Sequence, residues 1–238
     1  MFDCAGEVSP ADDLAARFGY LPAPRLLEAL DAAFPPGRLA LVSSFGTESA
    51  VLLHMVSRVD PALPVIFLDT GKLFPETLAY RDLLVNRLGL ADVRSIRPDA
   101  ARLAEYDPEG TLFGSDPDLC CAIRKTMPLD QALEGTEAWI TGRKRAQGGL
   151  RGSIRAIETG PDGRIVINPL HDWTRAEIDA YFAAHALPRH PLEEQGYPSL
   201  GCATCTFRAR AGEGSRAGRW AGTGKTECGI HLPRQRVT

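Results

Sequence analysis

The cysteines of this sequence are the residues whose spacing points most directly to chemistry. Cys120 is followed directly by Cys121, and Cys202 forms a C-x-x-C pair with Cys205. Two close pairs of thiolates can ligate a tetrahedral metal ion or an iron–sulfur cluster. Zinc ligand pairs are normally separated by two to four residues, so the adjacent pair counts against zinc. Four buried cysteines without a metal remain the structural alternative.

A further cysteine, Cys228, lies in the segment KTECGIH among positively charged side chains. Lys225 and His231 flank it, and Arg216 and Arg219 precede it. Positive charge stabilises a thiolate and lowers the pKa of a cysteine below its ordinary value of about 8.5. A thiolate is a nucleophile at neutral pH. We therefore predict that Cys228 is a catalytic nucleophile, whereas the alternative is an exposed and unreactive cysteine.

Three loops have the composition of anion-binding segments. SSFGTES and LDTG each follow an apolar run, so backbone N–H groups and hydroxyls there can face an anion at a helix N-terminus. TGRKRAQGGLR contains Arg143 and Arg151, and guanidinium groups bind phosphate or sulfate through paired contacts. We predict that a nucleotide binds between the first two loops and that an anion binds at the third. The alternatives are that the first two are ordinary turns and that the third is a solvated basic loop. The predicted binding residues of the first two loops are Ser43, Ser44, Gly46, Thr47, Leu68, Asp69, Thr70 and Gly71.

These loops must be positioned by the elements that precede and follow them. Strands alternating with helices of ten or more residues indicate βαβ units, and hence an α/β fold with a parallel sheet and helices on both faces. Ligands bind such sheets at the carboxyl ends of the strands. Thr174 and Glu177 form a capping box at the start of one helix. The predicted strands are 39–44, 64–71, 92–98, 138–141 and 164–170, and the predicted helices are 25–34, 48–59, 75–88 and 174–185.

Length and composition limit the function classes. A chain of 238 residues suits one domain, 1–210, with a Gly-, Arg- and Ser-rich segment, 211–238, that we expect to be mobile. The net charge of −3 gives no general attraction to nucleic acid, and no apolar run is long enough to span a membrane. The N-terminus has no signal-peptide pattern, so we expect a cytoplasmic protein, in which clustered cysteines serve metal or redox chemistry.

Three motifs taken together, CCAIRK, GCATCT and KTECGIH, resemble the assimilatory sulfonucleotide reductases. The two cysteine pairs resemble those of the branch that reduces adenosine 5′-phosphosulfate (APS) and carries a [4Fe–4S] cluster. The resemblance extends from about residue 43 to residue 231. It implies an adenine-nucleotide alpha-hydrolase-like (ATP pyrophosphatase-like) fold, and a [4Fe–4S] cluster whose ligands are Cys120, Cys121, Cys202 and Cys205.

The resemblance also implies a mechanism. The Cys228 thiolate attacks the sulfur of APS, AMP leaves, and thioredoxin or a similar dithiol protein releases sulfite from the resulting S-sulfocysteine. Lys125 lies four residues after Cys121, so on a helix it would share a face with that ligand, between the cluster and the sulfate. The cluster is then an electrostatic and structural element. The implied catalytic residues are Cys228, Lys125 and His231, and the implied substrate-binding arginines are Arg143, Arg151, Arg216 and Arg219.

Three alternatives stay open from the sequence. A reductase of the 3′-phosphorylated nucleotide (PAPS) resembles the tail but lacks the two cysteine pairs, and dual activity is a variant of this alternative. An adenylating enzyme of the ATP pyrophosphatase type would be expected to have a loop like S-G-G-x-D-S, which SSFGTES does not match. A zinc-containing nucleic-acid-binding module is disfavoured by the acidic balance. Association into a homo-oligomer is left open.

Overall fold

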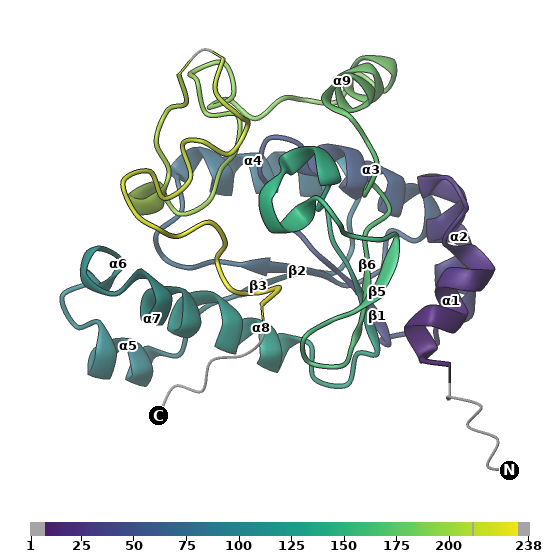
Figure 1. Ribbon diagram of the computed structural model, residues 1–238, viewed down its shortest axis with the longest axis horizontal. Coiled ribbons are helices and arrows are strands. Elements are labelled where there is room, and N and C mark those ends of the chain that lie inside the picture. The colour runs from purple at the N-terminus through teal and green to yellow at the C-terminus, as the bar shows by residue number, and fades with distance from the viewer. Residues whose placement is uncertain (1–7, 211, 233–238) are drawn as a thin grey trace, which may run out of the picture.

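Six short strands form the centre of the computed structural model, which describes residues 8–210 and 212–232. Helices cover both faces of this sheet, as Figure 1 shows, with α3 and α4 on one side and α8 on the other. Cys4 lies outside the described residues. Among the described residues, no helix is both long enough and apolar enough to cross a lipid bilayer.

The strand order identifies the point of the sheet at which a ligand is expected to bind. The order is β3-β2-β1-β4-β6-β5, with every neighbouring pair parallel except β5 and β6. The chain runs outward from β1 through β2 to β3, and then returns to the other side of β1 as β4. This reversal is the switch point at which open α/β sheets bind ligands. The strands are β1 (Leu39–Val42), β2 (Val65–Leu68), β3 (Val93–Ile96), β4 (Ala138–Ile140), β5 (Ile157–Thr159) and β6 (Ile165–Ile167).

Alternate strand residues build the two faces of the core. Leu39 and Leu41 pack into the larger cluster, with residues from α1 to α4 and α9. Ala40 points to the opposite face and packs near Leu129 of α8. The run LALV is apolar throughout because both faces are buried. The helices of eight or more residues are α1 (Pro10–Phe18), α2 (Ala23–Ala33), α3 (Ser49–Val59), α4 (Pro75–Leu88) and α9 (Arg175–Ala184).

The segment that carries the first cysteine pair is helical but irregular. Here α7 (Pro117–Cys121) ends at Cys121, a π-helical turn follows at Ala122–Thr126, and α8 (Met127–Ala132) continues the path. Pro128 has no N–H to donate to the preceding turn, which favours a widened turn at this point. Single π turns occur frequently at functional sites.

The predicted parallel α/β sheet with helices on both faces is confirmed, and one strand was not predicted. The edge strand β5 runs antiparallel to β6, with Ile157 opposite Ile167. Its sequence IET is too short to show a periodicity. The short helices α5 (Ala100–Tyr106) and α6 (Leu112–Ser115) were also not predicted.

Residues 212–232 form turns that lie against the rest of the structure. Trp220 is buried, its backbone N–H donates to the Cys205 carbonyl at 2.9 Å, and Arg219 forms a β-bridge with Thr206. The glycine-rich composition gave no sign of this buried tryptophan. The mobility expected for residues 211–238 remains a prediction.

Candidate active site

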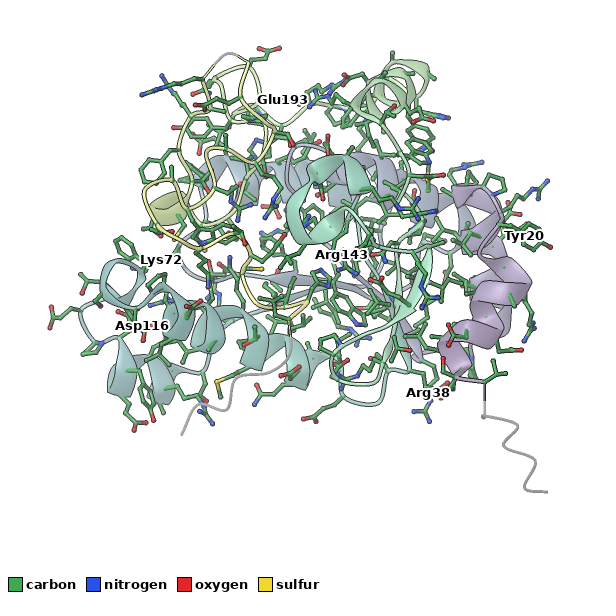
Figure 2. All side chains as sticks on the ribbon, viewed as in Figure 1. Tyr20, Arg38, Lys72, Asp116, Arg143 and Glu193 are labelled. Carbon is green, nitrogen blue, oxygen red and sulfur yellow. The ribbon has the colours of Figure 1, made fainter. Side chains whose placement is uncertain are left out.

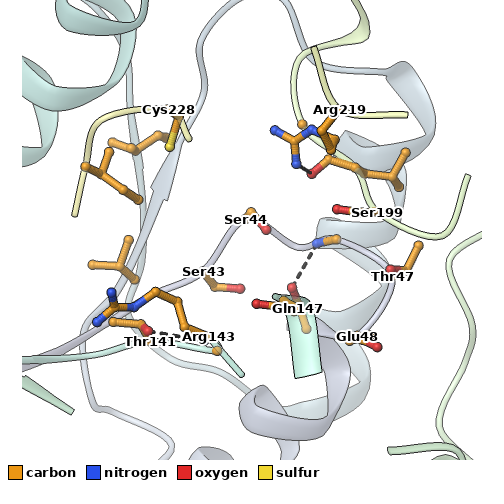
Figure 3. Close-up of a pocket in the computed structure, with 18 of the residues that line it drawn as sticks. Ser43, Ser44, Thr47, Glu48, Thr141, Arg143, Gln147, Ser199, Arg219 and Cys228 are labelled. Carbon is orange, nitrogen blue, oxygen red and sulfur yellow. Dashed lines mark hydrogen bonds between the residues drawn. The ribbon is translucent and has the colours of Figure 1, made fainter. Parts of the chain in front are cut away.

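A cavity of about 220 Å³ opens at the carboxyl ends of β1 and β4, the switch point of the sheet. Figure 3 shows Ser43 and Ser44 below it and Thr141 and Arg143 beside them, each just past the end of a strand. The structure brings together most of the residues predicted from the sequence. Those that line the cavity are Ser43, Ser44, Gly46, Thr47, Leu68, Thr70, Lys125, Arg143, Arg151, Arg216, Arg219, Cys228 and His231.

The loop after β1 is held by its own hydrogen bonds. Ser43 Oγ accepts the Phe45 N–H at 3.2 Å, and Ser49 Oγ accepts the Gly46 N–H at 2.8 Å. Phe45 has a φ of +47°, rare for a bulky residue, and its ring is held edge-on against Phe67. The N–H groups of Phe45 and Gly46 are therefore already paired within the loop.

The loop after β2 divides its residues between two roles. Leu68 and Thr70 line the cavity, whereas Asp69 and Gly71 are not part of its lining. The Asp69 carboxylate accepts hydrogen bonds from Arg97 Nε at 3.0 Å and from the Gly71 N–H at 3.2 Å. Gly71 has a φ of +68°, which favours glycine at this turn. Asp69 therefore shapes the turn that presents Thr70.

Two cations of the arginine loop are already paired with carboxylates. Arg143 lies in the middle of the molecule (Figure 2), where it bonds to Glu158 of β5 and, through Nε at 3.2 Å, to Asn168. Lys144 Nζ lies 2.8 Å from a Glu48 carboxylate oxygen. The unpredicted edge strand thus supplies the acid that neutralises Arg143.

Arg151 is paired with an acid from the C-terminal segment. Its Nε and one terminal nitrogen bond to the two Glu227 carboxylate oxygens at 2.6 and 2.8 Å. Arg216 lies 3.2 Å from the same carboxylate. Burial raises the pKa of Glu227, but hydrogen bonding and charge from Arg151, followed by the charges of Arg216 and Arg219, outweigh burial and lower it. Glu227 is therefore a carboxylate at neutral pH.

Cys228 lies next to this ion pair and faces the cavity half-buried. Figure 3 shows its sulfur on one side and the Arg219 guanidinium on the other, both directed inward. Burial lowers the pKa of Arg219, and negative charge on Cys228 would oppose this. Burial followed by the charge of Arg151 lowers the pKa of Arg216 to about 10. Crowded, partly desolvated cations of this kind favour an anion between them.

The end of the described segment anchors the tail in the cavity. The His231 ring stacks on Trp139 of β4, with centroids 4.8 Å apart and planes at 7°. Ile230 packs against the smaller core cluster. His231 is thus placed at the site as predicted, in contact with a tryptophan that was not predicted as a site residue.

The four paired cysteines line a second cavity beside the first. Cys120 and Cys121 come from α7, Cys202 directly precedes the 3-10 turn Ala203–Cys205, and Cys205 ends that turn. Lys125 lines both cavities, as expected for a residue between the cysteines and the substrate. Among the described residues, no group of three or more acidic, cysteine or histidine side chains has the geometry to hold a single metal ion.

The groups around these cysteines suit a sulfur-rich anionic ligand. Thr70 Oγ1 lies 3.3 Å from Cys202 Sγ and accepts the Lys72 N–H, so its own proton is available to the sulfur. Trp220 also lines this cavity, and its indole N–H is buried without a hydrogen-bond partner among the described residues. Burial raises the pKa of Cys202, but Lys125 and the Thr70 hydrogen bond outweigh it and lower the pKa. Four cysteines with such donors fit an iron–sulfur cluster.

Several lining residues were not predicted as site residues from the sequence. Glu227 was part of the quoted tail motif, but its pairing with an arginine 76 positions away had no local signal. The sequence indicated Trp139 only as part of a buried strand. Another unpredicted group is the segment before the C-x-x-C pair that lines the cavity, made up of Pro198, Ser199, Leu200 and Gly201.

Taken together, the fold and this site define an α/β domain with a cavity at the switch point of its sheet and a half-buried cysteine, Cys228, facing into that cavity. Residues 38–208 match the model of the phosphoadenosine phosphosulfate reductase domain family. The adenosine 5′-phosphosulfate reductase of Chelativorans sp. (strain BNC1) is 50% identical over 223 residues, which cover 93% of this chain and 90% of that protein. The chain therefore belongs to the phosphoadenosine phosphosulfate reductase domain family.

Solved structures agree with this assignment. The phosphoadenylyl-sulfate (PAPS) reductase of Candida auris, in a phosphate complex, superposes with a TM-score of 0.72 at 27% identity, covering 83% of this chain and 96% of that chain. The FMN adenylyltransferase of Candida glabrata superposes with a TM-score of 0.57 at 14% identity, covering 85% and 74%, which shows a shared fold alone. The predicted family and fold class are confirmed.

Proposed function

We propose that this protein reduces APS to sulfite and AMP through a covalent intermediate on Cys228. The observation that carries the proposal is that Cys228, Lys125 and Arg219 line one cavity at the ends of β1 and β4. The thiol is thereby placed beside two cations where a nucleotide is expected. The proposed substrate contacts are those predicted from the sequence that line the cavity.

The proposed reaction balances in two stages. In the first stage, a lone pair of the Cys228 thiolate forms a bond to the sulfur of APS, and the bond from that sulfur to the phosphate oxygen breaks, with its electrons leaving on AMP. In the second stage, one thiolate of a thioredoxin-like dithiol protein attacks Cys228 Sγ, and sulfite leaves. The second thiol then releases Cys228 and completes a disulfide in the donor, which supplies the two electrons.

Residues of this chain stabilise charge during the first stage. Burial lowers the pKa of Lys125, but the charges of Cys202, Cys228 and Cys121 outweigh burial and raise it, so Lys125 is an ammonium at neutral pH. Together with Arg219 it can neutralise charge that develops on the sulfate oxygens and the leaving group. His231 holds the tail against Trp139.

A [4Fe–4S] cluster would be held by Cys120, Cys121, Cys202 and Cys205. When bound, it would supply a fixed negative charge behind Lys125 and a covalent link between the α7 segment and the C-x-x-C turn. Thr70 and Lys125 connect this region to the substrate cavity through their contacts to Cys202. The reduced thiols this requires are consistent with a cytoplasmic location.

We propose residues 1–210 as the nucleotide-binding domain and 211–238 as the segment that carries the nucleophile. Such a segment can cover the nucleotide in the first stage and expose Cys228 to the dithiol protein in the second. The two cysteine pairs favour APS over PAPS as the substrate. The named relative in Chelativorans is an APS reductase.

The test is anaerobic purification with analysis of iron and acid-labile sulfide, followed by mixing with APS or PAPS in the absence of a reductant. Intact-mass spectrometry should show one added SO₃ group with APS, and peptide mapping should place it on Cys228. The variant Cys228→Ser should keep its iron and form no adduct. An adduct on this variant would show that the nucleophile is another residue, and a faster reaction with PAPS would reverse the substrate preference.

A further inference from the structure

The cations of the cavity fall into two groups once their partners are taken into account. Arg143 and Lys144 are paired with Glu158 and Glu48. Arg151 and Arg216 share the Glu227 carboxylate. Lys125 and Arg219 form no ion pair with a carboxylate within residues 8–210 and 212–232. The sequence predicted Arg143, Arg151, Arg216 and Arg219 together as substrate-binding arginines, and the structure separates them by their ion-pair partners.

Glu227 is the acid that creates this difference on the tail side. Its side chain is 11% exposed, and those of Arg151 and Arg216 are 13% and 16% exposed. Ion pairs with this little solvent are weakly screened, so the carboxylate cancels one of the two positive charges and occupies the nitrogens that the two arginines would otherwise offer to a ligand. Arg216 is also fixed by donating to the Thr226 carbonyl at 3.0 Å, next to Glu227 in the chain.

The two cations that form no ion pair with a carboxylate in the described part of the chain lie beside the nucleophile. Charge on Cys228 acts on both Lys125 and Arg219. Arg219 Nε is buried without a hydrogen-bond partner among the residues that the structure describes, although another of its nitrogens donates to the Leu200 carbonyl at 2.7 Å. An unpartnered, buried guanidinium nitrogen in a cavity wall points to an acceptor supplied by a ligand.

A substrate with two adjacent anionic groups can be oriented only if the cations of the cavity differ in how strongly they attract an anion. A phosphosulfate could place either group against a row of equivalent arginines, and only one placement brings its sulfur to Cys228. We propose that Glu227 is a positioning residue: by pairing with Arg151 and Arg216 and cancelling one of their two charges, it directs the transferable oxyanion to Lys125 and Arg219 beside Cys228. This inference rests on the proposed function.

The test compares Glu227→Gln with Glu213→Gln, a matched change in the same segment. Glu213 accepts the Arg210 N–H and does not line the cavity, so its variant should behave as the wild type. In Glu227→Gln the freed arginines should bind inorganic sulfate about tenfold more tightly, the effect of about one charge-assisted hydrogen bond. The rate of adduct formation on Cys228 at saturating APS should fall about tenfold or more, because the sulfur is misplaced.

A further variant, Glu227→Asp, separates the positioning role of the carboxylate from a role that depends only on its size and shape. Glu227→Asp keeps the charge and should retain wild-type sulfate affinity with an intermediate adduct rate. Unchanged sulfate affinity in Glu227→Gln would overturn the inference. A wild-type adduct rate at saturating APS would also overturn it, and would mean that Glu227 only occupies the anion site until the substrate replaces it. Absence of an adduct on the wild type and on Glu213→Gln would overturn the proposed function as well. The sulfate titration measures whether Arg151 and Arg216 are free to bind an anion, and it does not depend on that reaction.

Discussion

The imidazole of His231 stacks face to face on the indole of Trp139, with ring centroids 4.8 Å apart and an angle of 7° between the planes. This contact joins the last part of the described tail to the central strand β4. Since Cys228 lies three residues earlier, the stack also restrains the nucleophile. Stacked aromatic pairs contribute about 0.5–1.5 kcal/mol beyond the area they bury.

We therefore expect His231→Ala to loosen the tail without unfolding the domain. Alkylation of Cys228 by iodoacetamide, followed by peptide mass spectrometry, should be about 2- to 10-fold faster than in the wild type. The control is His185→Ala, because His185 lies against Tyr181 of α9, away from the cavity. Equal alkylation rates in His231→Ala and the wild type would show that the stack does not hold the tail.

Lys125 should matter more for the rate of sulfur transfer than for folding. Lys125→Met removes the ammonium beside Cys228 and should slow adduct formation about 100-fold, as for the loss of one preorganised charge-stabilising group. Lys125→Arg should recover part of this loss. Single-turnover mixing with APS measures the rate, and iron analysis shows whether the cysteine site is still loaded.

Lys72 provides the matched control for Lys125. It lines the cysteine cavity, but its ammonium donates to the Gly110 carbonyl at 2.7 Å and it does not line the substrate cavity. Lys72→Met should therefore leave the adduct rate near that of the wild type. Similar losses in both variants would mean that any positive charge near the cysteines is sufficient.

A side chain at residue 201 is expected to impair substrate binding, because it would displace Arg219. A Cβ at residue 201 would overlap the Arg219 guanidinium, which is the flexible end of its side chain. Gly201→Ala should therefore fold with little loss of stability while displacing Arg219, and should raise the KM for APS about tenfold. Gly214→Ala is the control, because a Cβ at residue 214 would meet nothing within 4 Å. A wild-type KM in Gly201→Ala would show that Arg219 does not contact the substrate.

The buried ion pair between Arg124 and Asp107 predicts a pH dependence of stability. Their side chains are 7% and 2% exposed. Burial raises the pKa of Asp107, but the Arg124 hydrogen bond, followed by that of the Leu112 N–H, outweighs burial and lowers it below 3.8. A lowered folded-state pKa stabilises the fold above the unfolded value, and this contribution is lost as pH falls through the folded value.

Asp107→Asn should accordingly lower the free energy of unfolding by about 3–5 kcal/mol at pH 7, because it leaves a buried guanidinium unpaired. The difference from the wild type should shrink below about pH 4. Urea unfolding at several pH values measures both effects. Asp12→Asn, which breaks an exposed pair with Arg155, should cost far less than Asp107→Asn, and an equal cost would contradict the buried-pair argument.

Local sequence determined the elements that carry the site. The apolar runs at β1 and β2, and the helix that starts from the Thr174 capping box, follow from the period and caps of a few consecutive residues. The cysteine pairs and the KTECGIH segment were recognisable because their chemistry depends on residue type and close spacing. The strand β5 and the π-helical turn at Ala122–Thr126 escaped prediction because three to five residues are too few to show a period.

Only the tertiary structure decided which charged groups act on one another. Arg143, Arg151 and Arg219 look alike in the sequence, yet the fold gives the first two a carboxylate and leaves the third with an unpartnered Nε among the described residues. Charge pairing depends on distances across the molecule, and Glu227 and Arg151 meet only because the tail returns to the edge where β1 and β4 end. Residue types set the available chemistry, and the packing of distant segments set which cations remain to perform it.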